Sequence, residues 1–261
     1  MRKSLIIGID LSFNSTGITV SYLEDGEGKL MEFYRLVYET TPNPIENINQ
    51  QTYTLPTNVS VIDLIVEDSK DAYSEDQALI TLKAMICCKR IMKIVCEVVD
   101  RFKPNDIYFN IEGFVMPSMT GSQQLRVLGG LIMLQGQLRS DLIKLKLSQT
   151  NIDDFKIYIT SPSELKLFFT GNGSADKQMM LDYFLDLFDG DLLLPNTESL
   201  GKVNDVVDSF ALMLNCFYRL HTKKARKLTT FEKKKIKKQL ERKAAGKKEK
   251  PVKEKPTILF L

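Results

Sequence analysis

Four carboxylates lie where an unpaired charge would be costly. Asp10 and Glu112 each end a short apolar stretch that is typical of a buried strand. A charge in such a place is unfavourable unless it is paired or binds a metal ion. Asp205 and Asp208 are three residues apart in a segment with helical periodicity, so they share one face of that helix. The four residues are therefore candidates for one acidic site.

Metal-assisted hydrolysis is the chemistry that such a set of carboxylates could perform. Hard divalent cations prefer oxygen ligands. Two Mg²⁺ ions about 3.5–4 Å apart can activate a water molecule and stabilise the leaving oxygen of a phosphodiester. Asp205 and Asp208 alone would fit surface residues stabilised by the helix dipole better than a metal site. Together with the two strand-end carboxylates, however, they predict a two-metal centre.

The histidine and cysteine content excludes several other chemistries. His221 is the one histidine in 261 residues, which rules out a two-histidine zinc site and argues against a Ser-His-Asp triad. The four cysteines show no C-x-x-C spacing, and three of them share one apolar helical pattern. This predicts buried free thiols rather than a zinc site. Any hydrolysis would depend on carboxylates, lysines and bound metal.

The elements that must position these residues can be read from apolar periodicity and turn signals. Apolar stretches predict strands at 4–10, 17–23, 30–38, 107–111 and 155–159, with a further short strand at 61–66 inside a polar segment of about 40–75. Helical periodicity predicts helices over 76–101, 121–147, 162–169, 174–188 and 202–220, the third of them opened by a capping box at Ser161 to Glu164. This order predicts an α/β fold, a mixed five-stranded sheet flanked by helices.

The charge divides the chain into a body, 1–221, and a basic tail, 222–261. Residues 222–256 hold 16 Lys or Arg and four Glu, a net charge of +12 against +3 for the whole chain. The tail could be a solvated, solubilising extension, but so long and one-sided a run favours binding to nucleic acid. The candidate phosphate contacts in it are Lys223, Lys224, Arg226, Lys227, Lys233, Lys234 and Lys235.

The ends of the chain carry two further expectations. Ile258, Leu259, Phe260 and Leu261 form an apolar peptide after the basic run. It could dock on a replication or recombination protein, and a chance apolar end is an equal alternative. The apolar stretch before Asp10 is too short for a secretory signal, and no run is long enough to cross a bilayer, so we expect a cytoplasmic protein.

Several motifs resemble those of the RuvC-type Holliday-junction resolvases, which belong to the ribonuclease H-like superfamily. They run in order over roughly 4–220, with the spacing of a single domain of that family. They are Gly8-Ile9-Asp10-Leu11-Ser12 with Ser15-Thr16-Gly17, Ile111-Glu112, the segment from Lys166 through Gly171-Asn172-Gly173-Ser174-Ala175-Asp176 to Lys177, and Asn204-Asp205-Val206-Val207-Asp208. The polar segment at 40–75 and the tail have no counterpart, which suits a divergent or virus-encoded member.

The resemblance implies a DNA endonuclease acting on four-way junctions, with Mg²⁺ as cofactor and Mn²⁺ as a substitute. Asp10, Glu112, Asp205 and Asp208 would be the catalytic metal ligands. Lys166 and Lys177 would contact phosphate, and Lys177 would also assist proton transfer. Phe114 could wedge between bases or simply be a core residue. The helix over 121–147, with its three glycines, would form a homodimer interface on branched DNA.

Other functions fit part of the pattern. Gly8 to Gly17 also resembles the first phosphate loop of the actin and sugar-kinase ATPases, but we find no second phosphate loop. A nuclease of the same fold could act on flaps or RNA–DNA hybrids instead of junctions. A non-catalytic branched-DNA binder could keep the fold without the activity, although all four carboxylates are present.

Overall fold

The computed structural model describes residues 1–13, 15–39, 59–65, 77–114, 122–187 and 204–221. Its strands are β1 (Lys3–Asp10), β2 (Ser15–Glu24), β3 (Glu27–Glu39), β4 (Val59–Ile65), β5 (Asp106–Glu112) and β6 (Asp154–Thr160). Its helices are α1 (Gln77–Phe102), α2 (Ser122–Ser148), α3 (Pro162–Thr170), α4 (Lys177–Leu187) and α5 (Asn204–His221). Each element that the sequence predicts is therefore present.

The strands form one mixed sheet in the order β4-β3-β2-β1-β5-β6. β1 is antiparallel to β2 and parallel to β5, while β3 is antiparallel to β2. The outer pairs β3–β4 and β5–β6 are parallel. The fold class is α/β with a mixed sheet flanked by helices, as the sequence predicts. The expected number of five strands is wrong, because β4, the short strand inside the polar segment, joins the sheet at its edge.

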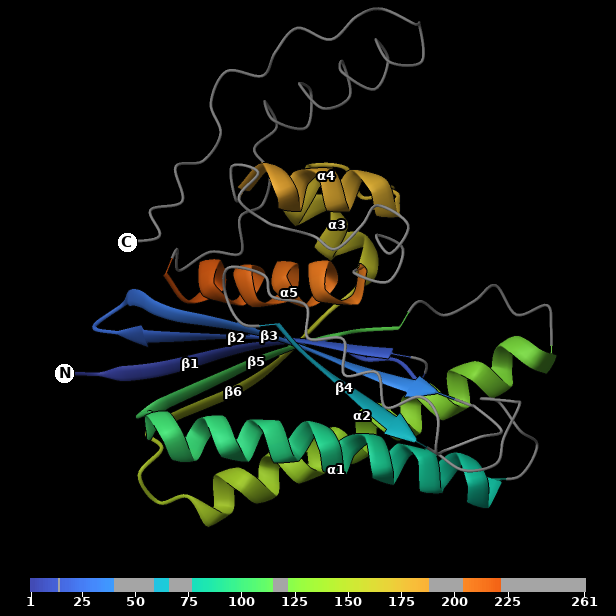
Figure 1. Ribbon diagram of the computed structural model, residues 1–261, viewed down its shortest axis with the longest axis horizontal. Coiled ribbons are helices and arrows are strands. Elements are labelled where there is room, and N and C mark those ends of the chain that lie inside the picture. Colours follow the sequence, from blue (N-terminus) through green and yellow to red (C-terminus); the bar gives the residue numbers. More distant parts are fainter. Residues whose placement is uncertain (14, 40–58, 66–76, 115–121, 188–203, 222–261) are drawn as a thin grey trace, which may run out of the picture.

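Helices cover both faces of this sheet (Figure 1). α1 and α2 lie together on one face, and α5 lies directly on the other. α3 and α4 pack on the outer side of α5, so that α5 is enclosed between them and the sheet. Eleven of the 18 residues of α5 are buried, as this position requires.

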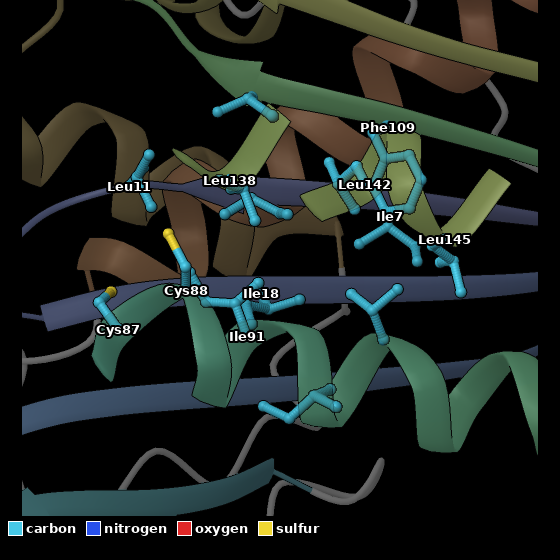
Figure 2. Packing of buried hydrophobic residues seen from close by; sticks show 14 of the residues in the cluster. Ile7, Leu11, Ile18, Cys87, Cys88, Ile91, Phe109, Leu138, Leu142 and Leu145 are labelled. Carbon is cyan, nitrogen blue, oxygen red and sulfur yellow. The ribbon is translucent and has the colours of Figure 1, made fainter. Parts of the chain in front are cut away.

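The face under α1 and α2 is a continuous apolar core (Figure 2). Ile7 of β1, Ile18 of β2 and Phe109 of β5 point into it. They meet Cys88 and Ile91 of α1 together with leucines from one side of α2. Cys87, Cys88 and Cys216 are buried and all four cysteines are free, as predicted from the sequence.

Two glycines set the distance between α5 and the sheet. A Cβ atom on Gly8 would lie 2.1 Å from the backbone oxygen of Ser209. One on Gly17 would lie 1.9 Å from the backbone oxygen of Asp205. Any side chain at either position would push the helix away, so α5 rests on the backbone of β1 and β2. The Thr19 hydroxyl shares a 2.8 Å hydrogen bond with the Ser209 hydroxyl at the same contact.

The helix ends agree with the sequence at α3 and differ at α4. Ser161 caps α3 by accepting a hydrogen bond from the backbone N–H of Glu164, with Pro162 in the first turn. α4 begins at Lys177 rather than at Ser174, because Asp176 is its cap and accepts a 2.8 Å hydrogen bond from the N–H of Met179.

The described part of the chain contains no helix long and apolar enough to cross a membrane.

Candidate metal centre

Asp10 and Glu112 are side by side at the end of two neighbouring strands. In the parallel ladder between β1 and β5, Ile9 pairs with Ile111, and each carboxylate is the next residue along its strand. Both side chains belong to the face under α5, since side chains alternate along a strand and Ile9 and Ile111 belong to the opposite core. The position of the two strands in the sheet therefore assembles the first half of the candidate site.

The first two turns of α5 carry the other two carboxylates to the same place. Asp10 pairs with Gly17 across the antiparallel ladder of β1 and β2. Because Gly17 has no side chain, the backbone of Asp205 lies directly over it. Asp205 and Asp208 thus face the end of β1. The structure brings together the four acidic residues that the sequence singles out.

Burial and mutual repulsion shift the pKa values of this group. Burial, followed by the charges of Glu112 and Asp208, raises the pKa of Asp10 well above its usual value. A side-chain hydrogen bond between Asp10 and Glu112 raises the pKa of Asp10 further and lowers that of Glu112. Burial also raises the pKa of Glu112, although the bond from Asp10 and the charge of Lys166 oppose that shift. Without a cation, these carboxyl groups retain protons that solvent-exposed groups would lose.

Asp208 connects the carboxylates to the two candidate lysines. Burial raises its pKa to about 7, and the charges of Glu112 and Asp205 add to the effect. Lys166 of α3 and Lys177 at the start of α4 act in the opposite direction. Both lysines are therefore close enough to the acidic group to influence it electrostatically. These are the two lysines that the resemblance assigns to phosphate contacts.

Asp205 is held by an arginine that the sequence analysis did not select. Arg35 of β3 donates a 2.9 Å hydrogen bond from Nε to Oδ2 of Asp205. The two residues are 170 positions apart. The available signal was an arginine in the middle of a strand, between Tyr34 and Leu36, because a charge on the covered face of a sheet needs a partner. The sequence did not reveal which residue that partner is.

Three other polar contacts fix the end of β5, and the sequence analysis missed all of them. Gln135 of α2 donates a 3.0 Å hydrogen bond to the backbone oxygen of Glu112. Asn110, fully buried, donates a 2.9 Å bond to the backbone oxygen of Leu212 in α5. Asn110 also accepts a 2.8 Å bond from the Thr160 hydroxyl. These contacts join β5 to the helices on both faces, so Glu112 has little freedom to move.

The donor set fits a hard divalent cation. Its ligands are all carboxylate oxygens, and Mg²⁺ and Mn²⁺ prefer such ligands. A cation would also relieve the repulsion that raises the pKa values of Asp10 and Asp208. Among the described residues, no three acidic, histidine or cysteine side chains form a ready-made ion site. Binding a cation would require these side chains to turn toward one another.

The remaining candidate residues are placed only in part. Phe114 is half-buried and follows β5 by two residues, and the chain immediately after it is outside the described part. The basic residues of the tail and the apolar peptide at its end also lie outside the described residues. The possible roles of Phe114 and of these segments therefore stay predictions.

Comparisons with known proteins give matches among solved structures. No family model and no curated protein sequence matches this chain. The structure of Thermus thermophilus RuvC is 15% identical and aligns over 84% of this chain and 96% of its own, with a TM-score of 0.38. T. thermophilus RuvC in complex with Holliday junction substrate is 13% identical over 85% and 97%, also with a TM-score of 0.38. The yeast mitochondrial Holliday junction resolvase, Ydc2, is 12% identical over 87% and 82%, with a TM-score of 0.40.

Proposed function

We propose that this protein is a metal-dependent DNA endonuclease that resolves four-way junctions. The observation that carries the proposal is the convergence of four carboxylates from β1, β5 and α5 at one end of the sheet. Burial, and after it the charges of the neighbouring carboxylates, raises the pKa of Asp10 and of Asp208, as expected where several carboxylates share one site. Structural ion networks can also perturb pKa values, so the assignment depends equally on the lysines beside the carboxylates.

In this proposal Asp10, Glu112 and Asp208 hold a pair of divalent cations, with Asp205 as the fourth ligand. Bound Mg²⁺ or Mn²⁺ supplies Lewis-acid activation of water and stabilises the leaving oxygen. Lys166 and Lys177 bind the phosphate oxygens beside the scissile bond. Lys177 also donates a proton from Nζ to the leaving oxygen. Close packing of α5 on the sheet keeps the ligands preorganised.

The choice of a junction as substrate is supported by the sequence motifs, above all the segment from Lys166 to Lys177. Paired cleavage of a four-way junction needs two centres, and we propose that a homodimer supplies them. The outer face of α2 supports this proposal, because Ile132, Ile143 and Leu147 are exposed there. Gly136 lies on the same face with no described atom within 4 Å of a Cβ built on it.

The basic tail would add affinity without sequence preference. Its lysines and arginines would neutralise phosphates and release counterions, which makes binding salt-dependent. Deleting 222–261 should weaken junction binding more than it slows turnover. The slope of log affinity against log salt concentration should also become shallower, and equal slopes for the full and shortened chains would contradict this role.

Cleavage of a labelled four-way junction with Mg²⁺ tests the function. Duplex, flap and RNA–DNA hybrid substrates are measured in parallel, and an Asp10→Asn protein is the control. Symmetric paired nicks in the junction, absent from the control, are the expected result. Cleavage of flaps or hybrids instead would retain the metal centre and change the substrate. Junction binding without any cleavage would overturn the nuclease proposal in favour of a structural DNA-binding protein.

A further inference from the structure

Arg35 belongs to a row of residues that crosses the sheet at the level of the candidate centre. Gly17 pairs with Asp10 on one side and with Arg35 on the other. Paired residues in a ladder present their side chains to the same face of the sheet. Arg35 and Asp10 therefore flank Gly17 on the face covered by α5, and the gap that Gly17 leaves is filled by the backbone of Asp205.

Asp205 consequently interacts with groups on two sides. Its Oδ2 accepts the 2.9 Å bond from Arg35. Its charge also raises the pKa of Asp10 and the pKa of Asp208, so the carboxylate remains within electrostatic range of both. Asp205 is therefore the carboxylate through which Arg35 of β3 is linked to the other acidic residues.

This ion pair differs from the others among the described residues in its degree of burial. The Arg35 and Asp205 side chains are 14% and 19% exposed. Every other described ion pair includes at least one side chain that is at least 44% exposed. Screening by solvent is weakest for buried pairs, so the Arg35 contact constrains its carboxylate more than a surface pair would.

We propose that Arg35 is a positioning residue for the metal centre, an inference that rests on the proposed function. Arg35 holds Asp205 by one oxygen, Oδ2, and leaves the other oxygen for a divalent cation. Residues that hydrogen-bond to ligating carboxylates orient them and tune metal affinity. Its positive charge also offsets part of the repulsion among the four carboxylates. Arg35 lies outside the motifs that resemble the resolvases, and nothing in those motifs assigns it a role.

Calorimetric titration of the full-length protein with Mn²⁺, without DNA, tests this role independently of cleavage. Arg35→Met removes the bond to Asp205 and keeps much of the side-chain volume. Arg101→Met is the matched control. Arg101 also pairs with a carboxylate of β3, the buried Glu32, but that contact belongs to the other face of the sheet. We expect Arg35→Met to weaken Mn²⁺ binding by about 10–100-fold and Arg101→Met to leave it unchanged.

A double-mutant cycle separates positioning from a general effect on charge or folding. If Arg35 acts through Asp205, then Arg35→Met adds no further loss of Mn²⁺ affinity in a protein that already carries Asp205→Asn. Arg35→Lys keeps the charge without the Nε geometry, and it replaces Arg35→Met if that variant does not fold. We expect the lysine to restore only part of the affinity.

The outcomes distinguish this inference from the proposed function. If the unmodified protein binds Mn²⁺ and Asp10→Asn abolishes binding, but both Arg35 variants match Arg101→Met, the positioning role is overturned and the metal centre stands. Additive losses for Arg35→Met and Asp205→Asn would also overturn it. If the unmodified protein binds no Mn²⁺, the proposed function fails, and the inference fails with it.

Discussion

The two faces of β1 and β5 are built from alternate residues of the same strands, yet they have different compositions. Toward α1 and α2 the strands present only large apolar side chains: Leu5, Ile7, Ile9, Ile107, Phe109 and Ile111. Toward α5 the same strands present Ile6, Gly8, Asp10, Tyr108, Asn110 and Glu112. The apolar character of the second face is thus lost toward the carboxyl ends of both strands.

Packing differs between the faces in a corresponding way. Side chains interdigitate under α1 and α2 (Figure 2), so the spacing there depends on side-chain volume. Under α5, the glycines bring backbone against backbone, and hydrogen bonds that involve Asn110 and Thr19 add to the apolar contacts of the helix. We infer that the first face mainly stabilises the fold and that the second fixes the geometry of the carboxylates.

Neighbouring residues on opposite faces provide the sharpest test of this division. Asp10→Asn should reduce cleavage by at least about a hundredfold, since a ligand should matter no less than the residues that orient it. The unfolding free energy of the metal-free protein should not fall, because a neutral amide replaces a carboxyl group whose charged form is disfavoured by burial and by its neighbours. Ile9→Val should keep cleavage and lose about 0.5–1.5 kcal/mol. Junction cleavage and urea unfolding measure both effects. Similar losses of unfolding free energy for Asp10→Asn and Ile9→Val would contradict the proposed difference between the two faces of the sheet.

Enlarging the contact beneath α5 should damage fold and site together. A Cβ on Gly17 would lie 1.9 Å from the Asp205 backbone oxygen, so Gly17→Ala must displace the helix. We expect a loss of about 1–3 kcal/mol together with weaker Mn²⁺ binding. Gly28→Ala, where no described atom lies within 4 Å of the added Cβ, is the control. Thermal unfolding and calorimetry report the two quantities. Unchanged Mn²⁺ affinity in Gly17→Ala would contradict the role assigned to this contact.

The pH dependence of stability offers a third test, which concerns the carboxylates on the face under α5. Burial and the charges of Glu112 and Asp205 raise the pKa of Asp208 from 3.8 to about 7. The folded protein therefore binds more protons than the unfolded chain between these values. Its metal-free stability should fall as the pH rises from about 4 to 7. Mn²⁺ affinity should rise over the same range, because binding displaces protons.

Asp208→Asn is the control for this pH dependence. Urea unfolding at a series of pH values without metal should give a flatter profile for the variant than for the unmodified protein. Equal profiles would show that other groups cause the dependence.

The smallest expected effect concerns the exposed side of α2. Gly136→Ala adds a methyl group where no described atom lies within 4 Å. Alanine is favoured over glycine inside a helix, so the monomer should gain about 0.5–1 kcal/mol without a change in Mn²⁺ affinity. Dilute thermal unfolding measures the gain. Sedimentation at higher concentration measures dimer formation, and weaker association would support the proposed interface at this helix.

The fold was largely predictable because apolar periodicity identifies strands and helices individually. The order of the strands in the sheet could not be predicted in this way, because the pairing of β4 with β3 depends on contacts between separate segments of the chain. The start of α4 was misjudged because Ser174 and Asp176 are both good helix caps. The structure shows that Asn172 accepts a bond from the Ser174 N–H, while Asp176 caps the helix.

The candidate site was predictable in its acidic residues and not in their neighbours. Asp10 and Glu112 could be recognised because each ends an apolar strand, and the resemblance grouped them with the Asp205–Asp208 pair. Arg35 could not be assigned, because its partner lies 170 residues away and only the pairing of β1, β2 and β3 brings them together. Gln135 was missed because it binds a backbone oxygen, and a backbone oxygen leaves no signature in the sequence.

The backbone contact at Gly8 and Gly17 also affects how such a chain can change over generations. Where side chains separate two elements, each substitution alters their spacing, and later substitutions must restore it. At these glycines the spacing of α5 and the sheet is set by backbone contact rather than by side-chain volume. The apolar residues elsewhere are free to drift in identity while the carboxylates keep their relative positions. An alignment of homologues should therefore show few identical residues, and Gly8 and Gly17 should be among them.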